Sequence, residues 1–256
     1  MTAMTATQEQ LDIGRVIQEL FAVLSRNLVT FGVLALILTG LPSAVANLLQ
    51  TEVEHNATAT GWAWFVSTTL IQAVAGLVLQ GALIYATIRD LNGRPIRVVD
   101  GLAIGMHNLL PLLGVGILYA VAVALGCILL VVPGVMIAVA WVVAVPVLIA
   151  ERLPVMATFG RSAELTRGNR WRIFGLLLLY LAFFLALTIV TSVANGIASF
   201  AADAVPGVLT VQHALFNVVS SVISALIGAT GGAVLYVELR RIREGVGHEE
   251  LATIFD

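Results

Sequence analysis

Six long apolar stretches without an acidic or basic side chain constrain this sequence more than any other feature. A helix needs about 20 apolar residues to cross a hydrocarbon core of roughly 30 Å, and each of these stretches approaches or exceeds that length. The sequence therefore predicts an all-α polytopic protein that forms a single integral membrane domain over residues 1–256. The predicted transmembrane spans are residues 28–50, 62–88, 109–132, 134–150, 173–199 and 211–237.

The composition agrees with a membrane protein and excludes several functional classes. Hydrophobic residues make up 59% of the chain and charged residues 11%, against roughly 45–50% and about 25% in an average soluble domain. The net charge of −2 provides no basic field for a nucleic-acid backbone. Because Cys127 is the single cysteine, neither a disulfide framework nor a thiolate metal site is available. We expect no cofactor and no metal.

The distribution of arginine predicts how the chain is oriented. All 13 basic residues are arginines, and all of them fall on one side of the six-span topology. Because cytoplasmic loops carry an excess of basic residues, we expect a multi-pass protein of a bacterial inner membrane with both termini in the cytoplasm. Residues 238–256 then form a cytoplasmic tail. The N-terminal segment lacks the basic region of a cleaved signal peptide and is expected to be retained.

Two prolines shape the middle of the chain. The third and fourth spans are joined only by Pro133-Gly134, which predicts a tight helical hairpin. Pro146 lies inside the short fourth span, and the carbonyl group that it leaves without a donor must be satisfied by a neighbouring helix.

Short segments on the cytoplasmic side are predicted to lie in the membrane interface. Residues 8–26 carry apolar side chains at helical spacing, which is typical of an interfacial helix. Residues 98–107 and 154–167 are weaker examples. Acidic residues at the ends of spans, Asp90, Glu151 and Glu238, have arginine neighbours, so we interpret them as ion pairs that lock helix ends, with a proton relay as the alternative.

An internal repeat is a further prediction. The segments 81-GALIYATIRDLNG-93 and 232-GAVLYVELRRIREG-245 resemble each other, and 144-AVPVLIAER-152 is a fainter copy. We interpret the chain as three repeats of an interfacial amphipathic helix followed by a transmembrane hairpin. The alternative is that membrane interfaces select similar residues everywhere.

Uncharged polar side chains form stripes along three of the spans. Small and polar residues at this spacing either allow helices to pack closely or line a cavity for a substrate. Within the stripes, Gln72, Gln80 and Asn195 are the cavity candidates, and Ser220, Ser224, Gly228 and Gly232 are the helix-packing candidates. The full stripes are Thr68, Gln72, Gly76 and Gln80 in the second span, Thr188, Ser192, Asn195 and Ser199 in the fifth, and the packing candidates in the sixth.

Catalytic patterns are missing from the sequence. The predicted spans contain no paired carboxylates, and the chain has no nucleophile with an evident base, no HExxH sequence and no phosphate-binding glycine loop. We therefore expect a protein that is not an enzyme.

Two segments carry a resemblance to a known family. The stretch 160-GRSAELTRGNRWRIFGLLLL-179, with Glu151 before it, and the stretch 235-LYVELRRIREG-245 resemble the membrane-domain family of glycerophosphoryl diester phosphodiesterases. The most specific parts are RSxxLTRGxxW and LYxxLRxxxEG, and the resemblance extends over residues 100–250. It implies a membrane region that is fused to a phosphodiesterase barrel or stands alone without an assigned activity. We expect a stand-alone membrane domain, and the family supplies no catalytic residues for these spans.

These observations favour one function and leave one alternative. The leading hypothesis is a lipid-interacting scaffold or partner-binding membrane module, whose cytoplasmic face engages anionic lipid head groups or a protein partner. The head-group candidates are Arg161, Arg167, Arg170 and Arg172. The alternative is a small-solute or lipid transporter that uses the polar stripes of the second, fifth and sixth spans. The sequence predicts no oligomeric state.

Overall fold

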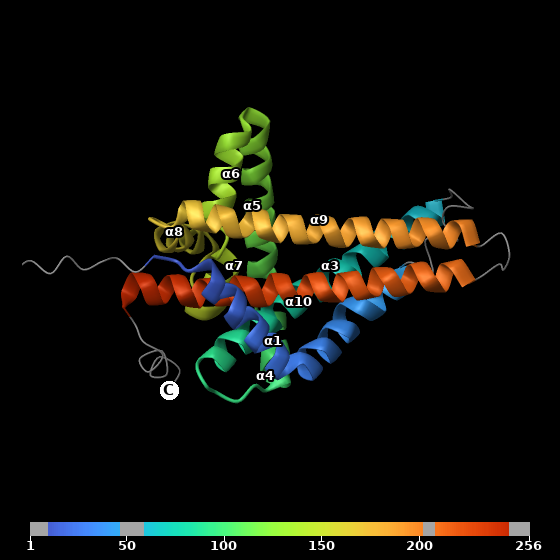
Figure 1. The fold of residues 1–256 in the computed structure, drawn as a ribbon, viewed down its shortest axis with the longest axis horizontal. Helices are drawn as coiled ribbons and strands as arrows, with labels where there is room; N and C mark the ends of the chain where they lie inside the picture. The colour runs from blue at the N-terminus through green and yellow to red at the C-terminus, as the bar shows by residue number, and fades with distance from the viewer. Residues whose placement is uncertain (1–9, 47–58, 202–207, 246–256) are drawn as a thin grey trace, which may run out of the picture.

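The computed structural model describes residues 10–46, 59–201 and 208–245, and every regular element within these ranges is a helix (Figure 1). A helical stretch over residues 41–46 follows the second element. In chain order the elements are α1 (Ile13–Ala35), the π-helical η1 (Leu36–Gly40), α3 (Ala59–Leu91), α4 (Val98–His107), α5 (Leu109–Leu129), α6 (Val131–Ala140), α7 (Ala144–Glu151), α8 (Val155–Leu165), α9 (Arg170–Ala201) and α10 (Val208–Glu244).

Six helical segments are long and apolar enough to cross a membrane, which confirms the predicted fold class. They are Ile13–Ala46, Trp62–Leu91, Leu109–Leu129, Val131–Glu151, Arg170–Gly196 and Leu215–Glu244. The last helix continues past the predicted end of its span at Val237 into the first part of the predicted tail. The end of the first predicted span, residues 47–50, and the tail residues 246–256 lie outside the described ranges.

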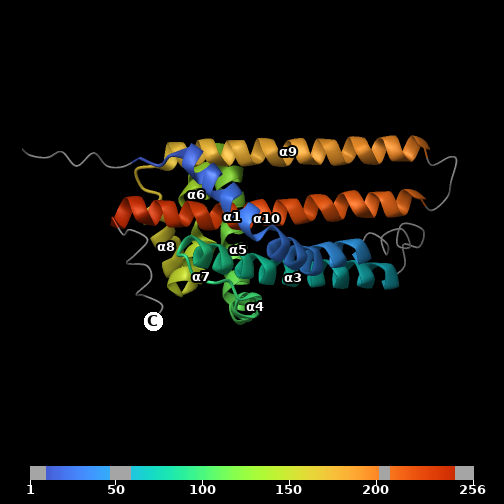
Figure 2. The same ribbon diagram turned by 60° about the horizontal axis from the view of Figure 1, so that its bottom comes forward.

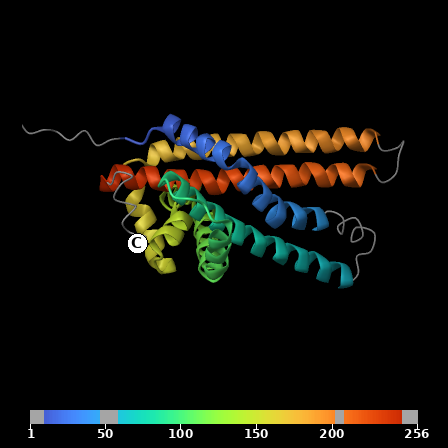
Figure 3. The same cartoon turned by 90° about the horizontal axis from the view of Figure 1, so that it is seen from below.

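The first helix bends where the predicted interfacial helix meets the first predicted span. Asn27 has non-helical backbone angles (φ −116°, ψ 16°) and separates two straight parts of α1. The part before Asn27 crosses over α10, and the part after it turns toward α3 (Figures 2 and 3). Nδ2 of Asn27 donates to Oδ1 of Asp90 at 3.0 Å, which ties the bend to the end of α3.

The α5–α6 hairpin lies across the other long helices. Helices α9 and α10 run side by side in opposite directions, whereas the hairpin projects from their side (Figures 1 and 3). Its turn is the extended residue Leu130, before the predicted position at Pro133-Gly134. Pro133 instead occupies the first turn of α6, where its missing N–H group is not needed. A Cβ atom on Gly126 would lie 2.8 Å from Cα of Gly134, so the glycines let the two helices touch.

The fourth predicted span consists of two helices, α6 and α7, that are separated by a turn at residues 141–143. This break leaves the carbonyl group of Ala140 at a helix end. The hydroxyl groups of Ser162 and Thr166 donate to this oxygen at 2.9 and 3.3 Å. A helix end at this depth is stable only when its carbonyls find such partners. The carbonyl that Pro146 leaves without a donor is a different one, that of Val142 four residues earlier, so its satisfaction by a neighbouring helix stays a prediction.

The hydrophobic core lies at the arginine-rich end of the bundle. Its largest part is formed by the second half of α3, by α7 and by the second half of α10, where Leu83, Val147 and Tyr236 are fully buried. The opposite halves of the long helices expose large apolar side chains, including Trp64, Ile189 and Val219. Such surfaces suit a lipid environment.

Helix α4 packs against α3 through its glycines. A Cβ atom on Gly105 would lie 3.1 Å from the carbonyl carbon of Val78 and closer still to its oxygen, and one on Gly101 would lie 3.3 Å from the carbonyl oxygen of Ala82. The apolar side chains of Val99 and Met106 remain 76% and 62% exposed. These side chains therefore face away from the protein, as expected for an interfacial helix. The predicted threefold repeat stays a prediction. The α5–α6 hairpin runs in a different direction from the pair α1–α3 and from the pair α9–α10 (Figure 1).

Candidate functional site

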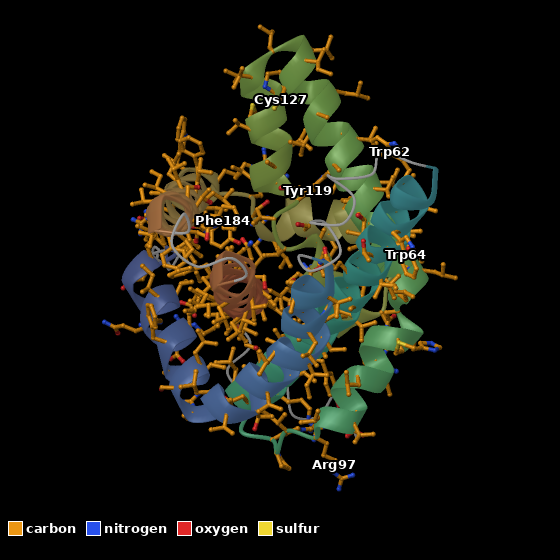
Figure 4. The ribbon with its side chains drawn as sticks, turned by 90° about the vertical axis from the view of Figure 1, so that its right-hand side faces the viewer. Trp62, Trp64, Arg97, Tyr119, Cys127 and Phe184 are labelled. Atoms are coloured by element: carbon orange, nitrogen blue, oxygen red, sulfur yellow. The ribbon has the colours of Figure 1, made fainter. Side chains whose placement is uncertain are left out.

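A polar cavity lies between the helical stretch of residues 41–46, α3, α9 and α10, in the half of the bundle away from the arginines. Its volume is about 500 Å³. Figure 4 views the molecule along α9 and α10, with Phe184 on the flank of α9. The cavity is lined by Ser43, Ala46, Gln72, Phe184, Leu187, Thr188, Thr191, Ser192, Asn195, Asn217, Ser220, Ser221 and Ser224. Ten of these 13 side chains are polar and none is charged.

The hydroxyl groups of the cavity donate their protons to their own helices. Thr188 donates to the carbonyl of Phe184 at 2.9 Å, Thr191 to that of Leu187 at 2.8 Å, and Ser224 to that of Ser220 at 2.7 Å. A hydroxyl that donates in this way keeps its oxygen lone pairs for other donors. The walls therefore present acceptors at several positions, and the amides of Gln72, Asn195 and Asn217 add groups that both donate and accept.

The structure brings together two of the three cavity candidates. Gln72 and Asn195 both line the cavity, and Nε2 of Gln72 donates to the carbonyl of Pro42 at 3.3 Å. Gln80 does not line it, because it lies two helical turns further along α3, where the neighbouring Val78 and Leu79 are buried in the core. The side chain of Ser199, the last member of the stripe on α9, lies outside the described residues.

The stripe on α10 divides into two parts with different surroundings. Ser220 and Ser224 line the cavity, although they were predicted to pack against a helix. Gly228 does pack: a Cβ atom there would lie 3.1 Å from the hydroxyl oxygen of Tyr180 on α9. Gly232 approaches Pro146 of α7, at 3.7 Å from its Cγ atom. The cavity therefore ends where α10 begins to contact α9 and α7 closely.

A second polar cluster lies at the opposite end of the bundle and involves Arg161. Nε of Arg161 lies 3.0 Å from Oε2 of Glu151, its Nη1 lies 3.3 Å from Glu164, and its Nη2 contacts Glu244. Burial alone would lower the pKa of the Arg161 guanidinium, but its hydrogen bonds to Glu244 and Glu151 and their negative charges raise it above its ordinary value. Arg161 is thus held by three carboxylates of the protein and is not presented to a lipid.

The other head-group candidates do not form one site with Arg161. Arg172 donates to the carbonyl of Leu11 at 2.7 Å and contacts the side chain of Gln10, so it fastens the segment before α1. Arg167 is exposed, and Arg170 is half-buried. Trp171 beside Arg170 is 85% exposed. Of the four candidates, only Arg167 and Arg170 have side chains without a hydrogen bond to the described parts of the chain.

Ion pairs join the helix ends; Glu238 pairs with its near neighbour Arg241, whereas Asp90 and Glu151 pair with arginines other than their sequence neighbours. Asp90 pairs with Arg26 at 2.7 Å and Glu151 pairs with Arg161, each from a different element. Glu238 pairs with Arg241 at 2.9 Å and also with Arg15 of α1 at 3.5 Å. These pairs connect α1 with α3 and α10, and α7 with α8, at the arginine-rich end. A proton relay has no support in this arrangement.

The sequence reasoning missed the structural role of the RSxxLT segment. Ser162, Leu165 and Thr166 are buried, and the two hydroxyl groups hold the end of α6. Further along, Oδ1 of Asn169 accepts a hydrogen bond from the backbone N–H of Leu11 at 3.1 Å. The sequence feature that indicates this role is the four-residue spacing of Ser162 and Thr166, which places both hydroxyls on one face of a helix.

Neither a metal site nor a known relative adds to this description. Within the described ranges, no group of three or more histidine, cysteine, aspartate or glutamate side chains could hold a metal ion. No protein-family model, no curated protein and no solved structure matches the chain. The resemblance to the membrane domain of glycerophosphoryl diester phosphodiesterases therefore stays a prediction.

Proposed function

We propose that this protein is a membrane carrier for a small, uncharged, hydroxyl-bearing solute, which binds in the cavity between the helical stretch of residues 41–46, α3, α9 and α10. The observation that supports the proposal is the convergence of uncharged polar side chains from four elements on one cavity of about 500 Å³. Ligand cavities in proteins have volumes of roughly 300–1,000 Å³. Polar groups gather on one face of a membrane span either because they line a cavity or because they pack against another helix.

The chemistry of the walls defines the solute class. Among the described residues, no acidic or basic side chain lines the cavity, so an ion would lose its hydration shell there without gaining a counter-charge. The serine and threonine hydroxyls offer acceptors, because their protons are bound to their own helices. Gln72 and Asn195 offer amide groups from opposite walls. This pattern suits a polyol, whose hydroxyl groups both donate and accept.

The position of the cavity supports a carrier over an open channel. The cavity occupies one half of the bundle, and the other half is filled by the core around Leu83, Val147 and Tyr236. A carrier has access from one side at a time, with its binding site near the middle of the membrane. Carrier action requires a second arrangement in which the core opens.

The proposal is tested with purified protein in liposomes, by light scattering after mixing with glycerol or ribitol. The expected result is solute entry that is faster than in empty liposomes. Asn195→Leu and Gln72→Leu should return the rate to that of empty liposomes, because each replaces an amide in the cavity wall by an apolar side chain. Gln80→Leu is the matched control, since it makes the same change on α3 outside the cavity and should keep at least half of the rate.

Equal rates with and without the protein would overturn the proposal. It would also fail if Gln80→Leu abolished entry as completely as Gln72→Leu, because the effect would then come from the helix and not from the cavity.

A lipid-interacting scaffold is the second candidate, and the exposed side chains of Arg167 and Trp171 favour it. Arginine and tryptophan side by side are typical of a membrane interface. A double variant, Arg167→Lys with Arg170→Lys, leaves Arg161 and its carboxylates intact. If a head-group site needs the guanidinium fork, this variant should retain less phosphatidylglycerol during purification. Unchanged retention would contradict a specific site.

A further inference from the structure

The polar cavity has an incomplete wall, because α9 contacts only part of its surroundings. Helices α3 and α10 and the π-helical η1 all pack against one another, whereas α9 makes its main contacts with α10 and α6. No comparable contact joins α9 to α3 or to η1 within the described residues. Helix α10 lies between α9 and α3 (Figures 2 and 3). The cavity is therefore open to the side between α9 and α3, and we call this gap in its wall the lateral opening.

The polar face of α9 is exposed at the cavity. The side chains of Thr188 and Ser192 line the cavity and are exposed. The hydroxyl group of Thr188 donates to its own helix, and that of Ser192 forms no hydrogen bond within the described parts of the chain. Hydrocarbon offers no partner to such groups. These side chains are therefore arranged for a polar group that comes from outside the protein.

Apolar side chains lie directly beside the polar ones. Ile71 follows the cavity side of α3 at Gln72, and Leu185 follows Phe184 on α9, and both apolar side chains are exposed. Adjacent residues on a helix point about 100° apart, so the surface changes from polar to apolar within one residue. A molecule in the lateral opening thus meets polar groups on its inner side and apolar groups on its outer side.

The cavity reaches toward the middle of the membrane. Gln72 lies ten residues after Trp62, the first residue of its span, and Thr188 lies eight residues before Gly196, the last residue of its span. At 1.5 Å per residue, these separations are about 15 and 12 Å, close to half of a hydrocarbon core of roughly 30 Å. A head group in the cavity therefore lies near the bilayer centre and still contacts polar side chains.

We propose that the molecule bound in the cavity is a neutral glycolipid, a lipid whose uncharged head group is a single sugar. This inference rests on the proposed function and names the molecule that the carrier moves. The sugar enters through the lateral opening and binds the polar side chains, while the acyl chains stay in the bilayer. The carrier then moves the lipid from one leaflet to the other. The charged head group of a phospholipid finds no counter-charge among the described residues that line the cavity.

The lateral opening favours a lipid over a water-soluble solute. A carrier must separate a water-soluble solute from hydrocarbon, which an incomplete wall does not do. A lipid requires such a wall, because its chains cannot follow the head group into a polar cavity. A sugar also suits the cavity because it is amphipathic: its hydroxyl groups meet Ser220 and Ser224 of α10, and the apolar face of its ring packs on Phe184.

The test measures which lipid the full chain retains. The protein is purified in an amine-oxide detergent, because glycoside detergents carry sugar head groups that would compete for the cavity. It is exposed to phosphatidylcholine vesicles with equal fractions of monoglucosyl diacylglycerol, diacylglycerol and phosphatidylglycerol of the same chain length. Lipids retained after repurification are counted by native mass spectrometry. We expect the glucosyl lipid to be retained at least tenfold over each of the other two.

The double variant Thr188→Leu, Ser192→Leu is decisive. It removes two hydroxyl groups from the cavity, and both positions are exposed, so the protein should fold as before, which size exclusion checks. Its retention of the glucosyl lipid should fall at least tenfold. Thr69→Leu is the matched control, because Thr69 is an exposed threonine of α3 that does not line the cavity. This control should retain as much glucosyl lipid as the unmodified protein.

Movement between leaflets is measured in liposomes with a glucosyl lipid that carries a fluorescent group on its acyl chain. Dithionite added outside quenches the outer leaflet, and with active protein it should quench all of the labelled lipid. The double variant should leave the inner leaflet fluorescent, as in empty liposomes, whereas Thr69→Leu should behave as the unmodified protein.

Three results would overturn the inference. The unmodified protein retains glucosyl lipid and diacylglycerol equally, or the double variant retains as much glucosyl lipid as Thr69→Leu, or the protein is a stable dimer without glycolipid preference. The last result would mean that a second copy fills the lateral opening. The ribitol assay described above separates the two proposals: entry that depends on Gln72 without glycolipid preference refutes the lipid alone, and failure of both assays refutes the carrier as well.

Discussion

Replacing Gly105 by alanine tests the close packing of α4 on α3. The added Cβ atom would lie 3.1 Å from both the carbonyl carbon and Cα of Val78, and closer still to the carbonyl oxygen. These are backbone atoms in the middle of a helix, so they cannot move aside as a side chain can. Relief requires α4 to shift away from α3, which also separates Gly101 from Ala82.

The expected size of the effect follows from two opposing contributions. Alanine favours a helix over glycine by about 1 kcal/mol, whereas overpacking a tight contact costs about 1–3 kcal/mol and occasionally more. Because the clash at Gly105 involves backbone atoms, we expect a net loss of about 1–2 kcal/mol. For a chain of this size, 1 kcal/mol shifts the unfolding temperature by roughly 2–4 °C. Gly105→Ala should therefore unfold about 2–8 °C below the unmodified protein.

Gly116→Ala is the control, because a Cβ atom on Gly116 in α5 would meet nothing within 4 Å. It should leave the unfolding temperature unchanged or raise it slightly. Both variants are compared by fluorescence-detected size exclusion after heating in detergent. Equal shifts, or a higher unfolding temperature for Gly105→Ala, would refute the reasoning.

Two further predictions concern the Arg161 cluster and the α5–α6 hairpin. Arg161→Lys should lower the unfolding temperature more than Arg167→Lys, since an ammonium group cannot hold three carboxylates in the geometry of a guanidinium; equal effects would contradict this role. A cysteine at Val132, in a Cys127→Ala background, should react with a membrane-soluble maleimide but not with an impermeant one added to either side, because the hairpin lies across the other helices. Labelling of Val132→Cys by the impermeant reagent from outside the cell would show that the hairpin crosses the membrane instead.

Part of the candidate site could be predicted from the sequence because helical periodicity is local. Polar residues every three or four positions lie on one face of a helix, and an uncharged polar face in a span must meet protein or a cavity. That argument selected Gln72 and Asn195, which both line the cavity. It could not separate Gln72 from Gln80, because the same face of α3 enters the core two turns further on, and only the packing of α7 and α10 determines where this happens.

The charged residues were harder to predict because their partners are distant in sequence. Glu151 is adjacent to Arg152, yet it pairs with Arg161, which in turn contacts Glu244 at the far end of the chain. Adjacent residues at a helix end point in different directions, so an acid beside an arginine seldom binds it. The same property explains why neither Asp90 nor Glu151 pairs with the arginine beside it in the sequence.

The two ends of the bundle therefore have different physical properties. At the arginine-rich end, ion pairs from Arg15, Arg26 and Arg161 join α1, α3, α7, α8 and α10 around a packed core. At the other end, α9 contacts α10 without such pairs in the described residues, and polar side chains line a cavity. Regions with few buried contacts open at low free energy. A change of access is thus expected to begin with movement of α9 against α10 near Gly228, where a single glycine contact with Tyr180 separates the cavity from the core.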